Sequence, residues 1–179
     1  MDSARSEHYA RLRHLRESFA EANERLVARL RRVDDQAAQR PPAEGGWSAA
    51  QIGWHVAKVT ASFADLMSGE APGAQPLPEG FRERDWAGEI VPGMPPKLKT
   101  SGRFEPPPHV TRDAAVAALE SAGVRMARAL DTVTAERGAR HGISSPIVGG
   151  QISLYQLGEW ATAHVIRHNR QAKRALGEG

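Results

Sequence analysis

Apolar side chains recur at alternating steps of three and four along four segments of the chain, which is the spacing of one face of an α-helix. The first segment runs from Leu12 to Val33 and ends before a pair of prolines. The second starts with Ser48 as its N-cap and stops at Gly69, and its stripe consists of Ile52, His55, Val59, Ser62 and Leu66. Both segments predict amphipathic helices that bury one face.

The third and fourth segments follow the same rule nearer the C-terminus. Thr111 starts the third, whose stripe consists of Val116, Leu119, Gly123, Met126, Leu130 and Val133. Ser153 and Gln156 form a capping box at the start of the fourth, as Ser48 and Gln51 do in the second. The fourth stripe consists of Leu154, Leu157, Ala161, His164, His168, Gln171 and Ala175, with Gly177 just past the helix end. Two histidines and a glutamine thus occupy positions that the pattern assigns to the core.

Four such helices and no convincing alternating strand predict an all-α four-helix bundle. Modest linkers join the first helix to the second and the third to the fourth, which favours antiparallel neighbours in each pair. The connection over residues 69–110 is long, holds most of the prolines, and lets the second and third helices run parallel. Because it also carries several large apolar residues, we expect a partly packed flap; these residues are Phe81, Trp86, Ile90, Val91 and Met94.

The composition adds three constraints. A chain of 179 residues fits one domain over residues 1–179. The absence of cysteine excludes disulfides, zinc–thiolate sites and a cysteine nucleophile, so any thiol chemistry needs a thiol from outside. The N-terminus is charged and no run approaches the ~18 apolar residues of a membrane span, so we expect a cytoplasmic protein with no membrane partner. A net charge of +3, from 24 basic and 21 acidic residues scattered among one another, disfavours nucleic-acid binding.

Three of the seven histidines, His55, His164 and His168, lie on the stripes inside predicted helices. A buried imidazole without a partner costs about 1 to 3 kcal/mol, so three would remove much of a typical stability of roughly 5 to 15 kcal/mol. His164 and His168 are separated by about 6 Å along the helix axis and can reach one ion, with His55 completing the set from the second helix. We therefore expect a divalent metal ion, zinc or nickel first, with iron or manganese as alternatives. The competing interpretation is that the imidazoles are core residues satisfied by hydrogen bonds.

The other four histidines are expected to face solvent or to bond locally. His8 lies on the stripe of the first helix, but at the end of the bundle opposite His55. His14 falls off that stripe, and His109 and His141 are expected in loops.

Five residues near the three histidines have less certain roles. Gln171 could orient a ligand or bond to backbone, or it could be a polar residue at a fraying helix end. Trp47 is expected to pack as a staple before the second helix, and Trp160 either walls the site or packs in the core. Helical geometry turns Asp65 and Glu159 away from the centre of the stripes, so no general base is assigned and the catalytic residues stay unknown.

These features together resemble a known family. Trp47–Ser48 opening a helix, His55 within it, a long linker and then His164-x3-His168-x2-Gln171 on the last helix resemble the DinB-like superfamily of bacterial four-helix bundles. The resemblance covers nearly the whole chain in the order and length of its elements. It implies an up-down-down-up bundle, often a homodimer, with a divalent metal held by the three histidines. Several members are metal-dependent transferases or an isomerase that use bacillithiol or mycothiol, others have no assigned activity, and the family implies no DNA contact.

Two functions stay open at this point. The first is an enzyme, an S-transferase or hydrolase, whose metal activates a low-molecular-weight thiol or water for reaction with a small electrophile. Three protein ligands leave a coordination position open, which is typical of catalytic rather than structural metal sites. The second is a non-catalytic bundle that binds a metal or small ligand in a structural or sensor role.

Overall fold

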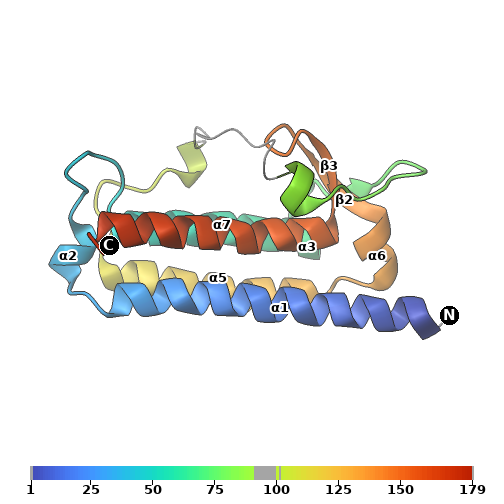
Figure 1. Cartoon of the computed structure of the whole chain (residues 1–179), viewed down its shortest axis with the longest axis horizontal. Helices are drawn as coiled ribbons and strands as arrows, with labels where there is room; N and C mark the ends of the chain where they lie inside the picture. Colours follow the sequence, from blue (N-terminus) through green and yellow to red (C-terminus); the bar gives the residue numbers. More distant parts are fainter. Residues whose placement is uncertain (1, 91–99, 101, 179) are drawn as a thin grey trace.

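Four long helices lie alongside one another in the computed structural model, which describes residues 2–90, 100 and 102–178 (Figure 1). They are α1 (Asp2–Arg31), α3 (Ala49–Ser68), α5 (Arg112–Asp131) and α7 (Leu154–Ala175). Two short helices, α2 (Asp35–Gln39) and α6 (Ala135–Arg140), lie at opposite ends of the bundle. The predicted four-helix bundle is confirmed. No helix in the described ranges is both long and apolar enough to cross a membrane.

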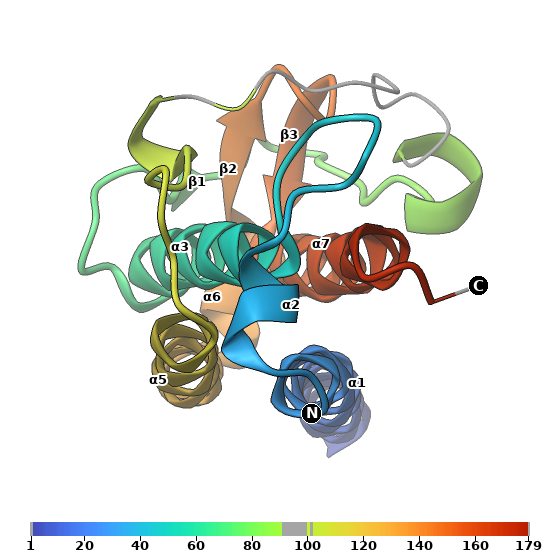
Figure 2. The same ribbon diagram turned by 90° about the vertical axis from the view of Figure 1, so that its left-hand side faces the viewer.

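The helices form two layers, with α3 and α7 in one and α5 and α1 in the other (Figure 2). Helices α1 and α7 run in one direction and α3 and α5 in the other, which is the expected up-down-down-up order. The adjacency predicted from linker length is wrong, because α1 packs on α7 and α5 and lies diagonally across from α3. The short helix α2 and residues 40–48 carry the chain across the end of the bundle, which places α3 diagonally opposite α1 rather than beside it.

The helix ends follow from local hydrogen bonds. Ser48 accepts from the backbone N–H of Gln51, and the Gln51 side chain accepts from the backbone N–H of Ser48, so the first capping box is complete. The second is only half formed. Ser153 accepts from the backbone N–H of Gln156, but the Gln156 amide donates to the carbonyl of Arg84 instead, at 2.8 Å. This side chain thus fastens the long connection to the start of α7.

Helix α1 begins ten residues earlier than its apolar stripe, at Asp2 rather than Leu12. The added turns are mostly exposed, so no apolar periodicity marks them. They contain no glycine or proline, and alanine, arginine and glutamate are favourable in helices, so nothing ends the helix there.

A small antiparallel sheet is present, contrary to the expectation of no strands. Its strands β1 (Gln75–Pro76), β2 (His141–Ser145) and β3 (Gly150–Ser153) are paired in that order. Such short strands give no readable alternation, and β1 pairs with a segment far along the chain. A Cβ at Gly142 would lie 1.9 Å from the carbonyl oxygen of Ile152, so only glycine fits at this position of β2. The sheet joins the start of the long connection to the segment before α7.

The long connection is partly packed, as predicted, within its described residues. Trp86 and Ile90 belong to a short π-helix (Trp86–Ile90), and Ile90 is buried while Trp86 and Phe81 are half-buried. A 3₁₀ turn (Gly102–Phe104) follows nearer α5 and contacts α3. Val91 and Met94, which were also expected in the flap, lie outside the described residues.

The core between the four helices is apolar. Its most deeply buried side chains come from all four long helices, and include Leu26, Leu30, Ile52, Met67, Leu119, Met126, Leu130, Leu154 and Leu157. Each such residue stabilises the fold by about 1.5 to 3 kcal/mol through burial. A Cβ at Gly53 of α3 would approach Leu30 of α1 to 2.9 Å, so the small residue permits close helix packing. The helices are therefore held together by ordinary apolar contacts.

Replacing Met126 with alanine tests this account of the core. The side chain is fully buried, so we expect the free energy of unfolding to fall by about 2 to 5 kcal/mol. Val124 lies on the same helix but is 54% exposed, so Val124→Ala should change the free energy of unfolding by no more than about 0.5 kcal/mol. Urea denaturation of the two variants makes the comparison, and equal losses would contradict the assignment of the core.

Candidate metal centre

The structure brings the three predicted histidines together from two helices. His55 lies on α3, and His164 and His168 lie one turn apart on α7. One ring nitrogen from each lies within 4.8 Å of the other two. The ring centroids are 5.2 Å apart for His55 and His164, 4.8 Å for His55 and His168, and 4.4 Å for His164 and His168. This cluster could hold a metal ion.

The cluster lies at the margin of the core, next to the fully buried side of α7. His55 is buried, whereas His164 and His168 are partly exposed. The fully buried side of α7 passes instead through Ala161 and Val165. Described parts of the long connection lie on the same side of the bundle as α3 and α7 (Figure 2), and Phe104 of this connection contacts His55.

Two hydrogen bonds orient the imidazoles. Nδ1 of His55 donates to the carbonyl oxygen of Phe104 at 2.9 Å, and Nδ1 of His168 donates to Oε1 of Gln171 at 2.8 Å. In each ring Nε2 is then left as the nitrogen with a lone pair, which is the usual arrangement of metal-binding histidines. The suggestion that Gln171 orients a ligand is thus supported over a fraying helix end. The Phe104 carbonyl was missed because a backbone group leaves no signal in the sequence.

His164 provides the test of whether the residues fit a metal. Its Nδ1 is buried and makes no hydrogen bond with any described residue. A buried polar atom without a partner costs about 1 to 3 kcal/mol. Binding of a cation by the three rings would offset this cost, and imidazole nitrogens are suitable donors for divalent transition metals. The cluster therefore fits a divalent metal ion.

The electrostatics of the site favour uncharged imidazoles. Burial lowers the pKa of His55, and the hydrogen bond to Phe104 opposes this only in part. Burial also lowers the pKa of His164 well below its usual value, with further contributions from His168, His55 and Arg167. The pKa of His168 falls to about 4, again mainly through burial. All three rings are neutral at pH 7, which is the form that binds metals.

Aromatic rings surround the cluster. The ring of Trp47 lies 4.8 Å from that of His55, so this tryptophan packs on a candidate ligand in addition to preceding the α3 N-cap. Phe63 lies 6.4 Å from His164 and 5.0 Å from Trp160, and Trp160 lies 6.5 Å from Trp86 of the long connection. Trp160 is buried and contributes to this wall through Phe63. The rings form an apolar border along one side of the histidines.

The other four histidines stay apart from the cluster. His8 was expected to face solvent or to bond locally, but it is buried, and its Nδ1 makes a hydrogen bond of 2.6 Å with the hydroxyl of Tyr155 on α7, which only the fold brings near. His14 and His109 are exposed, as expected. His141 was expected in a loop, but it is the first residue of β2 and is half-buried, because the short sheet gave no sequence signal.

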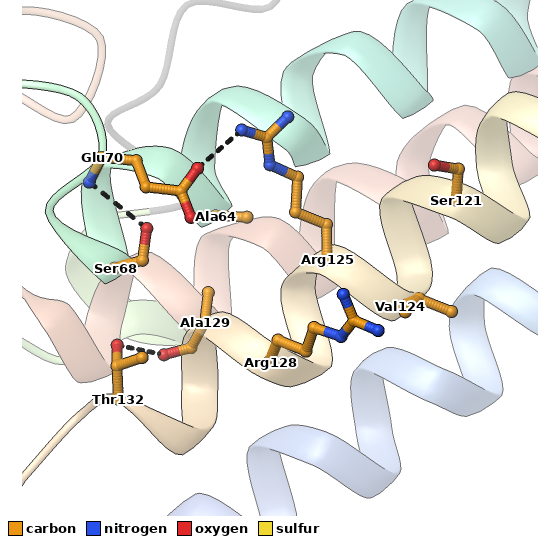
Figure 3. A pocket seen from close by; sticks show the side chains of 9 residues that line it. All are labelled: Ala64, Ser68, Glu70, Ser121, Val124, Arg125, Arg128, Ala129 and Thr132. Carbon is orange, nitrogen blue, oxygen red and sulfur yellow. Dashed lines mark hydrogen bonds and ion pairs between the residues drawn. The ribbon is translucent and has the colours of Figure 1, made fainter.

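Neither nearby acid faces the cluster, as predicted from helical geometry. Asp65 forms an ion pair with Arg125 at 2.5 Å, and Glu159 forms one with Arg11 at 2.9 Å. A cavity of about 530 Å³ lies between α3 and α5, and Arg125 lines it together with Ala64, Ser68, Glu70, Ser121, Val124, Arg128, Ala129 and Thr132 (Figure 3). It contains no histidine, so it is separate from the candidate metal centre.

Comparison with known protein families shows to which family the chain belongs. The model described as the DinB superfamily matches residues 18–172. The chain belongs to the DinB superfamily. No curated protein matches it. All three histidines of the cluster and Gln171 lie within the matched residues, so the DinB region contains the whole candidate centre.

The lowered pKa values predict acid sensitivity of the metal-free protein. Unfolded histidines titrate near pH 6.5 and the folded ones lower, so the unfolded state binds more protons between these values. The free energy of unfolding should therefore be independent of these groups above about pH 7. It should fall as the pH drops toward 4.5, by about 2 to 3 kcal/mol for the lowered pKa of His168 alone.

Urea unfolding at several pH values in the presence of a chelator measures this dependence. In the variant His168→Ala, the free energy of unfolding should fall less steeply as the pH is lowered. His14→Ala removes an exposed ring, so its free energy of unfolding should depend on pH as in the wild type. Identical slopes for the wild type and His168→Ala would contradict the burial of a neutral ring.

The hydrogen bond from His168 predicts a second effect. Gln171→Ala removes the acceptor that orients this ring, so the affinity for a divalent metal should fall roughly 10- to 100-fold. Gln171→Glu keeps an acceptor at the same position and should restore most of the affinity. Competitive titration against a chromophoric chelator measures both, and unchanged affinity in Gln171→Ala would show that the bond does not support the centre.

Proposed function

We propose that this DinB-superfamily protein is a metal-dependent enzyme that activates a low-molecular-weight thiol or water for reaction with a small electrophile. The observation that carries the proposal is the convergence of three neutral imidazoles, within 4.8 Å of one another, at the edge of the core. Zinc or nickel is the expected metal, with iron or manganese as alternatives, because neutral imidazole suits these ions.

The position of the cluster favours a functional centre over a structural one. The apolar core is complete without the histidines, and it joins all four long helices. A structural metal is expected where the fold has too few apolar contacts of its own. Here His164 and His168 are half-buried, at the margin of that core rather than within it. These features support the enzyme over the non-catalytic role in holding the core.

The residues of the site have distinct roles in this proposal. His55, His164 and His168 would hold the ion, and the Phe104 carbonyl and Gln171 fix the orientation of two of the rings. A divalent ion with an open position lowers the pKa of a bound thiol or water, so that the anion is available near neutral pH. The aromatic border limits water around the reacting groups.

The origin of the nucleophile follows from what the chain lacks. There is no cysteine in the sequence, so a thiol must come from solution. Asp65 and Glu159 form ion pairs with Arg125 and Arg11, and no carboxylate of the described residues is among the causes of the lowered pKa of the three imidazoles. The proposal therefore assigns no carboxylate base, and a free thiol is a more suitable substrate than water because its proton is lost more easily.

An activity screen tests the proposal. Protein purified without an affinity tag and loaded with zinc, nickel, iron or manganese is mixed with a panel of small thiols and 1-chloro-2,4-dinitrobenzene. We expect thiol-dependent formation of the dinitrophenyl thioether, and a loss of at least roughly 100-fold in His168→Ala because a ligand is removed. His14→Ala changes an exposed histidine and should retain the activity.

The folding of the variant is checked in the same experiment. His168→Ala should melt within a few degrees of the metal-free wild type, because the core does not depend on the cluster. Equal rates for His168→Ala and the wild type would exclude the histidine site as the catalytic centre. Tight metal binding without any reaction across thiols, water and electrophiles would favour the non-catalytic alternative.

A further inference from the structure

The first turns of α1 hold the long connection to the start of α7. Residues 2–17 of this helix precede the residues that the DinB superfamily model matches. Nη1 of Arg11 donates to Oε2 of Glu83 in the connection at 2.7 Å, and Nη2 donates to Oε1 of Glu159 on α7 at 2.9 Å. The guanidinium carbon also lies 4.4 Å from the centre of the Tyr155 ring. One arginine thus joins α1, α7 and the connection.

Glu83 is held at both of its carboxylate oxygens. Oε2 accepts from Arg11, and Oε1 accepts from the hydroxyl of Ser153, which is the N-cap of α7. The side chains of Arg11 and Glu83 are 30% and 31% exposed, so water screens this ion pair less than one on the open surface. Because each oxygen has its own donor, the carboxylate is fixed in orientation as well as in place.

The next residue of the connection is fixed as well. The backbone carbonyl of Arg84 accepts from the side-chain amide of Gln156 at 2.8 Å. The guanidinium of Arg84 donates to the carbonyl oxygen of Val148, in the loop between β2 and β3, at 2.5 Å. Residues 83 and 84 are therefore held by α1, by α7 and by the small sheet.

These anchored residues place Trp86 at the aromatic border of the histidine cluster. Trp86 follows Arg84 by two residues, and its ring lies 6.5 Å from that of Trp160, which is one helical turn before His164 on α7. Phe63 lies near both Trp160 and His164, at 5.0 and 6.4 Å. Trp160 and Phe63 are buried, whereas Trp86 is half-buried. Trp86 is thus the most exposed of these three aromatic residues.

A border of this kind favours one class of electrophile. A molecule that reacts beside His164 lies next to aromatic rings, which bind other aromatic rings through offset or edge-to-face contacts. Such contacts orient a substrate only if the protein ring is itself held in place. The anchor at residues 83 and 84 meets this condition for Trp86, because it fixes the backbone two residues away.

We propose that Trp86 binds an electrophile that carries an aromatic ring, and that the ion pair between Arg11 and Glu83 holds Trp86 in position for this contact. The inference rests on the proposed function and adds the class of electrophile. Trp86 is a specificity-determining residue in this account, whereas Arg11 and Glu83 act through it and are positioning residues.

Two electrophiles of different shape test the inference. The zinc-loaded protein is assayed with the thiol of the panel that reacts fastest and with either 1-chloro-2,4-dinitrobenzene, which is aromatic, or iodoacetamide, which is not. Trp86→Ala should raise the KM for the aromatic electrophile roughly 10-fold, because a ring contact is lost, and change the KM for iodoacetamide by less than about 2-fold. Glu83→Gln breaks the ion pair and should raise the first KM alone, by roughly 3- to 10-fold.

Matched variants separate positioning from a general effect on the fold. Arg11→Gln breaks the same ion pair from α1 and should reproduce the change in Glu83→Gln. Glu79→Gln removes an exposed carboxylate from the same connection and should leave both KM values as in the wild type. An equal rise of KM for both electrophiles in Trp86→Ala would overturn the inference, since a purely structural role predicts no selectivity. Wild-type KM values in both Glu83→Gln and Arg11→Gln would overturn the role of the ion pair.

Binding of an unreactive analogue measures the contact without any reaction. In equilibrium dialysis, the zinc-loaded wild type should bind 2,4-dinitroaniline roughly 10-fold more tightly than Trp86→Ala. Equal binding by the two proteins would overturn the inference even if the wild type is active. Tighter binding by the wild type, with neither electrophile converted by any thiol, would instead overturn the proposed function and support the aromatic contact alone.

Discussion

The antiparallel packing of α3 on α7 is the contact on which the candidate centre depends. His55 extends from one of these helices and His164 and His168 from the other, so the spacing of the three rings is set by the distance between two helix axes. That distance is fixed by apolar side chains below the cluster, together with α1 and α5 in the second layer. The rings are held close together by contacts in which they take little part. A centre arranged in this way needs little reorganisation when it binds an ion.

Three imidazoles can lie this close together because each is neutral at pH 7 and two are held in position by hydrogen bonds. Burial lowers the pKa of all three rings, which removes their mutual repulsion at neutral pH. Hydrogen bonds to the Phe104 carbonyl and to Gln171 fix the rings of His55 and His168. The buried Nδ1 of His164 has no such partner among the described residues. The cluster therefore carries a cost in stability, which binding of a metal ion would offset.

Much of this arrangement was predictable from the sequence. The steps of three and four located all four long helices, and the spacing of His164 and His168 predicted their common direction. Periodicity could not show that these rings lie at the margin of the buried stripe, because one turn of a helix spans both core and edge. The Phe104 carbonyl and the pairing of Gly142 with Ser153 depend on backbone groups brought together by the fold, and no side-chain pattern marks them. The diagonal placement of α1 and α3 likewise follows from how short helices cross the bundle ends.

The central claim is that the three histidines bind one metal ion. Diffraction from crystals of the protein grown with zinc, recorded on both sides of the zinc absorption edge, tests it most directly. The account predicts one strong anomalous peak between His55, His164 and His168, within about 2.0 to 2.1 Å of a nitrogen from each ring. A map without a peak at this position, or with zinc bound only at other histidines, would contradict it.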